Sequence, residues 1–181
     1  MARNFDKSLH TPPSKTQKLA FATQVFLRLL AIAATLAAAC VMLTTTQTNV
    51  VYGIQVDARY SYSPAFKFFA YANVVASVVS LLSLFLAFVL AKTALHSTHF
   101  FYFFLHDLIM TVLLIAGCSA ATAIAYVGKY GNTHTGWMPV CDNFAKFCNR
   151  IIISGFLSYM GFAVYLILTI ISAKKSQQLG A

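Results

Sequence analysis

Long apolar segments alternate with short polar ones along the chain. Four of these segments are almost entirely apolar, at residues 25–43, 68–91, 100–127 and 151–171. Each is close to the ~20 residues that an α-helix needs to cross a bilayer core of about 30 Å. None carries a polar helix face or alternates with period two, which argues against a soluble bundle and a β-barrel. The pattern therefore predicts an all-α fold, a bundle of four transmembrane helices.

Composition supports a membrane protein over a soluble one. Hydrophobic residues make up 59% of the chain and charged residues 9%, whereas soluble domains carry about 25% charged residues. The mean hydropathy is +0.72. We expect the lipid bilayer to be the partner of the basic segments that give the net charge of +9, because anionic headgroups attract basic segments beside a membrane helix. No basic, aromatic-rich surface domain indicates a nucleic-acid partner.

The polar segments predict the domain organisation. Residues 1–22 form a basic leader, expected to be disordered and to precede an uncleaved signal-anchor. Residues 23–173 form the membrane domain, and residues 174–181 form a short tail. Four spans place both termini on one side, where seven cations would lie, against five on the other: Arg3, Lys7, Lys15, Lys18, Lys92, Lys174 and Lys175, against Arg59, Lys67, Lys129, Lys146 and Arg150. The positive-inside rule then predicts cytoplasmic termini.

Two opposite charges interrupt the spans. Arg28 in the first span and Asp107 in the third are the only Asp, Glu, Lys or Arg residues within the four segments. Both helices would run in the same direction. Arg28 would lie roughly 15 Å beyond Lys18 and Asp107 roughly 12 Å beyond His99, so their depths in the membrane are comparable. A lone charge in a membrane helix costs about 2.5–3.5 kcal/mol. We therefore expect an Arg28–Asp107 ion pair, for which the planar guanidinium fork is suited to a bidentate contact. Snorkelling of Arg28 to the interface is the alternative.

Small residues recur at helical spacing on the second and third spans. Close helix packing in membranes depends on such residues. The stripes are Ala72, Ala76 and Ser80 on the second span, and Gly117, Ala121 and Ala125 on the third. They predict helix-packing surfaces, either between helices of one bundle or against a second copy of the protein.

A cysteine pair lies in the loop that this topology places outside. Cys141 and Cys148 would meet an oxidising environment there, which favours a disulfide. The alternative is a metal site with His134, although these three residues fall short of a tetrahedral ligand set. His96, His99 and His106 have spacings that also suit a metal, but we interpret them as polar residues near a membrane interface. We accordingly expect no resident metal and no cofactor.

Two sequence stretches show a resemblance to a known family. They are RYSYSPAFKFFAYANVV at residues 59–75 and YVGKYGNTHTGWMPVCDNFAKFCNR at residues 126–150. With four spans, Arg28 and Asp107, the chain resembles the Casparian strip membrane domain protein-like (CASP-like) family of plants, first subgroup, which is related to MARVEL-domain proteins. The first outer loop lacks the Glu- and Phe-rich signature of the Casparian-strip proteins themselves, so a role in building that structure does not carry over.

The resemblance implies a non-enzymatic scaffold in the plasma membrane. It implies a homodimer, or heterodimers with related members, that organises membrane domains or recruits cell-wall-modifying partners. The alternative is a small-solute or ion transporter or channel, whose route would be lined by Thr35, Ser77, Ser80, Ser83, Thr111 and Thr122. Such hydroxyls commonly bond to their own helix backbone instead. The phosphate-loop, HExxH and GxSxG motifs are missing from the sequence, and we predict no catalytic residues.

Overall fold

Four long α-helices dominate the computed structural model, which describes residues 15–92 and 98–180. They are α1 (Lys15–Leu43), α2 (Pro64–Lys92), α3 (Thr98–Tyr130) and α4 (Ala145–Gly180). Each contains an apolar stretch long enough to cross a membrane: Ala22–Leu43, Pro64–Leu86, Phe101–Tyr130 and Ala145–Lys174. The prediction of an all-α bundle with four transmembrane helices is therefore confirmed.

The helices extend beyond the predicted spans at their polar ends. α1 begins at Lys15, inside the segment expected to be a disordered leader, and α4 continues through the predicted tail to Gly180. Lys, Gln and Ala are good helix formers, so a helix can continue past the bilayer core that set the predicted limits. Residues 1–14 of the leader lie outside the described residues.

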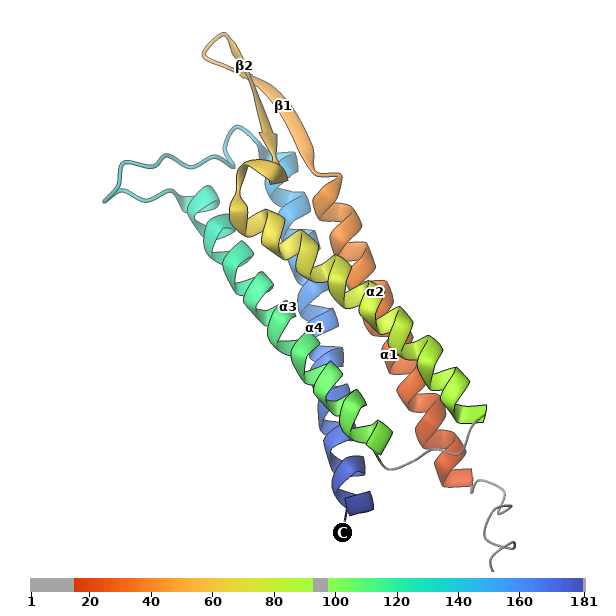
Figure 1. The fold of residues 1–181 in the computed structure, drawn as a ribbon. Helices are drawn as coiled ribbons and strands as arrows, with labels where there is room; N and C mark the ends of the chain where they lie inside the picture. The colour runs from red at the N-terminus through yellow and green to blue at the C-terminus, as the bar shows by residue number, and fades with distance from the viewer. Residues whose placement is uncertain (1–14, 93–97, 181) are drawn as a thin grey trace, which may run out of the picture.

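Successive helices run up and down, so that the start of α1 and the end of α4 lie at the same end of the bundle (Figure 1). We call this the terminal end. The helices pack in a closed ring in which α1 contacts α2 and α4, and α3 contacts α2 and α4. This arrangement brings α1 and α3 side chains into one shared interior.

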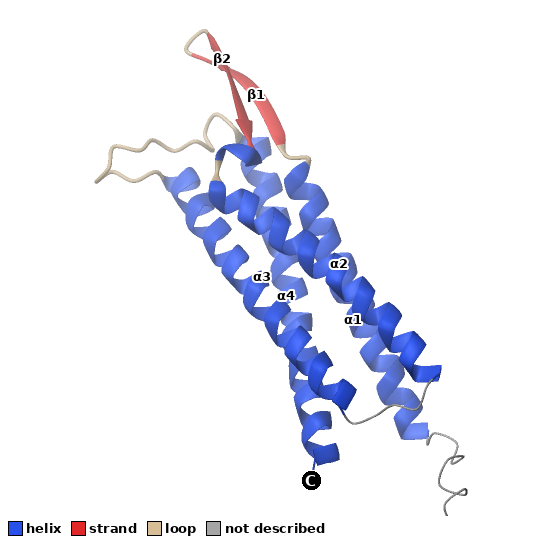
Figure 2. Ribbon diagram, in the orientation of Figure 1, coloured by secondary structure: helices blue, strands red, loops and turns tan. Residues whose placement is uncertain are grey.

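A β-hairpin projects from the opposite end of the bundle, which we call the hairpin end (Figure 2). Strands β1 (Thr46–Val51) and β2 (Ile54–Arg59) pair antiparallel, with Thr46 opposite Arg59 and Val51 opposite Ile54. Tyr52 and Gly53 form the turn with φ of 52° and 80°. Positive φ at both central residues suits the twist of paired strands, and glycine adopts it without steric cost. The sequence analysis did not predict this hairpin.

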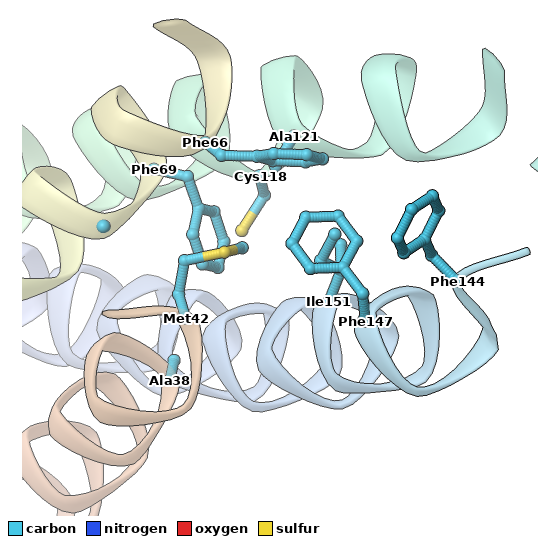
Figure 3. Close-up of a cluster of buried hydrophobic side chains, with 10 residues drawn as sticks. Ala38, Met42, Phe66, Phe69, Cys118, Ala121, Phe144, Phe147 and Ile151 are labelled. Atoms are coloured by element: carbon cyan, nitrogen blue, oxygen red, sulfur yellow. The ribbon is translucent and has the colours of Figure 1, made fainter. Parts of the chain in front are cut away.

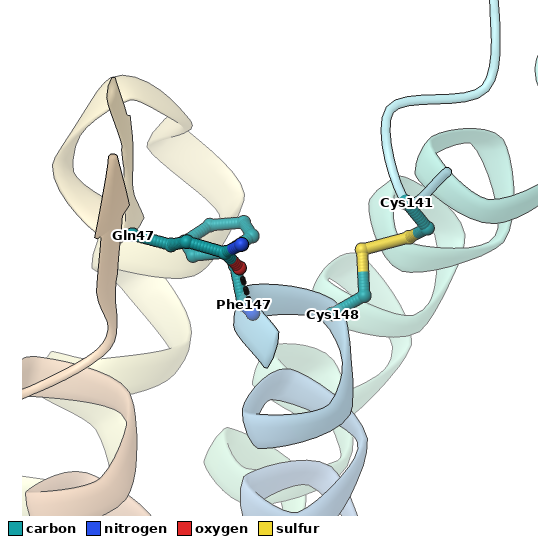
Figure 4. Close-up of a disulfide and its surroundings, with 4 residues drawn as sticks. All are labelled: Gln47, Cys141, Phe147 and Cys148. Carbon is teal, nitrogen blue, oxygen red and sulfur yellow. Dashed lines mark hydrogen bonds between the residues drawn. A yellow bond between two sulfur atoms is a disulfide. The ribbon is translucent and has the colours of Figure 1, made fainter. Parts of the chain in front are cut away.

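The hairpin is fastened to the beginning of α4. Gln47 on β1 accepts a hydrogen bond from the Phe147 backbone N–H at 2.8 Å, shown in Figure 4. Asn49 donates its side-chain amide to the Asn143 carbonyl at 2.7 Å. The first N–H groups of a helix lack partners within the helix. Gln47 provides a hydrogen-bond acceptor for one of these N–H groups. The bond holds the base of the hairpin against the bundle.

An apolar cluster fills the bundle beneath the hairpin (Figure 3). Its buried side chains come from all four helices and from the loop before α4: Ala38, Met42, Phe66, Phe69, Ala70, Cys118, Ala121, Phe144, Phe147 and Ile151. Phe66 and Phe147 pack edge to face with ring centroids 6.4 Å apart. The cluster therefore holds the beginning of α2 against the beginning of α4, close to Cys148 of the disulfide.

Candidate functional site

A buried ion pair joins α1 and α3 in the half of the bundle nearer the terminal end. Nη2 of Arg28 donates to Oδ2 of Asp107 at 2.9 Å. The two side chains are 3% and 0% exposed. Neither charge reaches solvent, so each depends on the other and on nearby polar groups for stabilisation.

Further hydrogen bonds connect the pair to α2, to α4 and to a neighbouring residue of α3. Nη1 of Arg28 donates to the Ser83 hydroxyl of α2 at 3.1 Å. The Ser172 hydroxyl of α4 donates to Oδ2 of Asp107 at 3.2 Å, and Nδ1 of His106 lies 3.0 Å from Oδ1. One polar centre therefore links all four helices. We call these five residues, Arg28, Ser83, His106, Asp107 and Ser172, the polar centre.

The geometry of the pair differs in one respect from the bidentate contact suggested by the sequence. Arg28 meets the carboxylate through Nη2, while Nη1 turns to Ser83. Its guanidinium also lies over the Phe103 ring, 5.1 Å from the centroid. The guanidinium of α1 therefore bonds to α2 through one nitrogen and to α3 through the other. His106, which the sequence analysis interpreted as a polar residue near an interface, is partly buried and lies beside Asp107.

A second polar contact crosses the middle of the bundle. The Tyr165 hydroxyl on α4 lies 2.5 Å from the Ser80 hydroxyl of α2 and donates to the Ala76 carbonyl at 3.2 Å. Tyr165 and Ser80 are fully buried. A buried phenol needs a partner of this kind. The contact ties α4 to α2 across the interior.

A third polar group lies nearer the hairpin end. Ser158 on α4 donates to the Asn73 side-chain oxygen on α2 at 2.9 Å and accepts from the Cys118 thiol on α3 at 3.2 Å. Ser154 on α4 donates to the Ala38 carbonyl of α1 at 2.7 Å. Each of these side chains is almost fully buried. The interior is thus cross-linked by hydrogen bonds at three levels.

Sequence reasoning missed several of these residues as members of a site. Asn73, Tyr165 and Ser172 were not proposed as partners, although helical spacing marks them. The polar and small residues of α4 recur every three or four positions, which places them on one helix face: Ser154, Ser158, Gly161, Tyr165, Thr169 and Ser172. A search for hydroxyls at that spacing would have found the stripe.

The predicted small-residue stripes face the interior of a single chain. Ala72, Ala76 and Ser80 are between 0% and 3% exposed. A Cβ added at Gly117 would lie 3.4 Å from the Ala72 Cβ. Ala121 is buried and Ala125 packs against the apolar cluster. Packing within one bundle accounts for the buried members of these stripes, whereas Ala125 is half-buried.

Cys141 and Cys148 form a disulfide that closes the loop onto α4 (Figure 4). Their sulfurs are therefore not free to bind a metal with His134, as the alternative interpretation required. Cys118 is a free, buried thiol, whereas the free Cys40 is exposed on the surface of α1. His96 lies outside the described residues.

Comparison with known proteins identifies the family. Residues 17–164 match the Casparian strip membrane protein domain, a stretch that includes Arg28, Ser83 and Asp107. The chain belongs to the CASP-like family. The resemblance seen in the sequence is thereby confirmed, and the protein is a multi-pass membrane protein of plant type.

Curated relatives place this CASP-like chain in subgroup 1F. It is 53% identical over 173 residues to CASP-like protein 1F1 of Vitis vinifera, covering 96% of this chain and 84% of the relative. It is 47% identical over 181 residues to CASP-like protein 1F1 of Populus trichocarpa, covering 100% of both chains. CASP-like protein 1F1 of Ricinus communis is 49% identical over 170 residues, covering 94% and 95%. None of these names describes an enzyme. No solved structure matches the chain.

Proposed function

We propose that this CASP-like protein is a non-enzymatic scaffold of the plasma membrane, which assembles with copies of itself or of related members and organises membrane domains or recruits partners that modify the cell wall. The observation that carries this proposal is the polar centre, in which Arg28 and Asp107 bind to each other and to groups on all four helices. Such a centre fixes one arrangement of the helices. A fixed bundle suits a protein whose outward surface is recognised by others.

Interior hydroxyls support a scaffold over transport. Thr35, Ser77 and Thr111 donate to carbonyls of their own helices at 2.9, 2.6 and 2.7 Å. Among the described residues, Nε2 of His106 is the one buried side-chain nitrogen or oxygen without a hydrogen-bond partner. A transport route needs polar groups that can bind a passing solute. Here those groups are used to hold the helices to one another.

The disulfide supports an orientation with both termini in the cytoplasm. It lies at the hairpin end, near Gln47 of β1 (Figure 4), and disulfides persist on the oxidising side of a cell membrane. The hairpin and the disulfide-bonded loop would then face the cell wall, where partners that modify the wall act. The terminal end would face the cytoplasmic leaflet, in agreement with the larger number of cations on that side.

Photobleaching of the fluorescently tagged protein in plant epidermal cells tests the scaffold proposal. We expect stable patches at the plasma membrane with slow recovery of fluorescence, because an assembled scaffold diffuses little. An unrelated four-span protein expressed at the same level serves as the freely diffusing control. Two differently tagged copies should also co-purify from solubilised membranes. Recovery as fast as that of the control, without co-purification, would contradict the proposal.

A flux assay distinguishes the alternative function. The purified protein is reconstituted into liposomes that enclose a fluorescent ion indicator. Their leakage is compared with that of liposomes containing the control membrane protein. The scaffold proposal predicts equal leakage from both. Ion or solute flux above the control, combined with free diffusion in cells, would replace the scaffold with a transporter.

A further inference from the structure

An apolar groove runs between α3 and α4 at the hairpin end. It consists of two adjoining cavities with volumes of about 290 and 280 Å³. Both are lined by Thr122, Ala125, Ile151 and Ile152, so one continues into the other. We call the combined feature the α3–α4 groove. The inner cavity reaches Tyr159, and the outer cavity ends at Lys129 beside the Cys141–Cys148 disulfide.

The groove opens on the surface of the bundle that faces lipid. Its walls belong to the apolar stretches Phe101–Tyr130 and Ala145–Lys174. Side chains on its rim point outward, with Ile152 54% and Phe156 66% exposed. Phe69 and Ile151, which belong to the buried apolar cluster drawn in Figure 3, line the inner cavity. Any occupant therefore lies in the hydrocarbon region and contacts apolar side chains.

The length of the groove matches one leaflet of a bilayer. From Cys148 to Tyr159, α4 rises roughly 16 Å at 1.5 Å per residue. Half of a bilayer core measures about 15 Å. A helix from a second copy is about 10–12 Å wide with its side chains, so it would lie across cavities of this volume without entering them. An extended acyl chain has the width to enter.

The polar atoms inside the groove do not oppose an apolar occupant. The Thr122 hydroxyl and the Tyr159 hydroxyl are hydrogen-bonded to each other at 3.1 Å. Covering a hydroxyl costs free energy chiefly when it loses its partner. Because these two satisfy one another, a hydrocarbon chain can cover both.

A cation marks the outer end of the groove. Lys129 lines the outer cavity, and its Nζ lies 5.4 Å from the centroid of the Tyr130 ring. Among the described residues, the ion pairs involve Arg28, Arg59 and His106, and none involves Lys129. An unpaired cation at headgroup level attracts the phosphate of an anionic lipid headgroup through direct charge interaction. We propose that the α3–α4 groove binds one acyl chain of an anionic phospholipid, whose headgroup contacts Lys129.

Native mass spectrometry of the full chain in detergent tests this site. The protein is mixed with equal amounts of phosphatidylglycerol and phosphatidylcholine of the same chain length, and retained lipid is counted. We expect one phosphatidylglycerol to be retained by the wild type. Gly155→Leu should lose it, because Gly155 lines the inner cavity and a Cβ there meets nothing within 4 Å. Gly128→Leu in the outer cavity is an independent variant with equally free space. Ala123→Leu is the control, since Ala123 is exposed on α3 outside the groove.

Lys129→Gln tests the headgroup separately. Removing the cation should lower the preference for phosphatidylglycerol over phosphatidylcholine about fivefold, while the chain still binds. Lys67→Gln is the matched control, because Lys67 is exposed at the same end of the bundle but does not line the groove.

Three results would overturn the proposal. Retention of lipid by both glycine variants would place the binding elsewhere. Equal retention of both lipids by the wild type would exclude anionic recognition. A dimer that dissociates in the glycine variants without any change in bound lipid would identify a second copy as the occupant. Gel filtration of each variant serves as the control for folding. None of these results depends on the scaffold proposal.

Discussion

Arg28 and Asp107 are separated by 79 positions in the chain, yet Nη2 of one lies 2.9 Å from Oδ2 of the other inside the bundle. Each carries a charge that is nearly or completely withdrawn from solvent. Ser83 and Ser172 bring α2 and α4 to the same point. Single and double substitutions in such a centre should change the stability of the bundle by different amounts, because removing one charge leaves the other buried without a counter-ion.

Removal of one charge should destabilise the bundle more than removal of both. Asp107→Ala leaves the Arg28 guanidinium buried without a counter-ion, a change that costs about 3–5 kcal/mol. Arg28→Met with Asp107→Leu removes both charges and should recover most of that loss. The measurement is thermal unfolding in detergent, followed by gel filtration of the tagged protein. A double variant as unstable as the single ones would show that the two side chains do not act as a pair.

The disulfide predicts a specific count of reactive thiols. The chain has four cysteines, and Cys40 and Cys118 are free. Labelling of the denatured protein with a polymer-linked maleimide should therefore add two labels without reductant and four with it. Cys141→Ser should raise the count without reductant to three, because Cys148 loses its partner. Closing this short loop contributes about 2–3 kcal/mol in the chain-entropy account. Four labels on the unreduced wild type would contradict the bond.

The spans and the two intramembrane charges could be predicted because each follows from a strong physical requirement. A backbone in hydrocarbon must satisfy its own hydrogen bonds, so four apolar segments of sufficient length indicate four helices. Arg28 and Asp107 stand out because ionised side chains are rare at that depth. These signals lie within single segments and need no knowledge of how the helices pack.

The remainder depended on packing that a single segment does not record. Ser83 and Ser172 resemble many other hydroxyl residues in the spans, and only the bundle shows which of them reach Asp107. The hairpin was missed because Tyr52 is an unusual first residue for a turn with positive φ, where Asn, Asp or Gly is the common signal. Likewise, the small-residue stripes predicted a close contact without indicating whether its other side belonged to the same chain.

The contacts of Asp57 at the base of the hairpin lead to a prediction for the pKa of its carboxyl, which lies outside the membrane-spanning segments. A hydrogen bond from the Tyr62 hydroxyl, followed by one from the Arg59 guanidinium, lowers the pKa of Asp57 below its ordinary value of 3.8. Tyr62→Phe should therefore raise this pKa toward 3.8, as measured by NMR titration of the side-chain carboxyl. Because the folded pKa is the lower one, the contribution to stability is present above 3.8 and disappears as pH falls through the folded pKa. Since the carboxyl is exposed, global unfolding should change little.

The outcome for Tyr62→Phe can be separated from a general loss of the hairpin. Tyr52→Asn changes the exposed turn residue to one that tolerates positive φ, so it should leave the pKa of Asp57 unchanged. An unshifted pKa in Tyr62→Phe would mean that the Tyr62 hydroxyl is not a partner of Asp57 in solution.

Close approach of α1 and α4 at Gly161 gives the sharpest test of the bundle. A Cβ at Gly161 would lie 2.8 Å from Cγ2 of Thr35, and Thr35 is held by its hydrogen bond to the Ala31 carbonyl. Gly161→Ala should therefore destabilise the protein by about 1–3 kcal/mol. Gly155→Ala on the same helix meets nothing within 4 Å and should be neutral or stabilising, because alanine favours helix.

A second substitution at Thr35 separates this contact from the general effect of an alanine at position 161. Thr35→Ser removes Cγ2 while keeping the hydroxyl that bonds to Ala31, so Thr35→Ser with Gly161→Ala should be more stable than Gly161→Ala alone. Thermal unfolding of the four variants in the same detergent measures the coupling as a double-mutant cycle. Additive effects of the two substitutions would show that α1 and α4 are not in contact at this point. A positive coupling places Gly161 against Thr35 and with it fixes the register of α4 on α1, on which the reach of Ser172 to Asp107 depends.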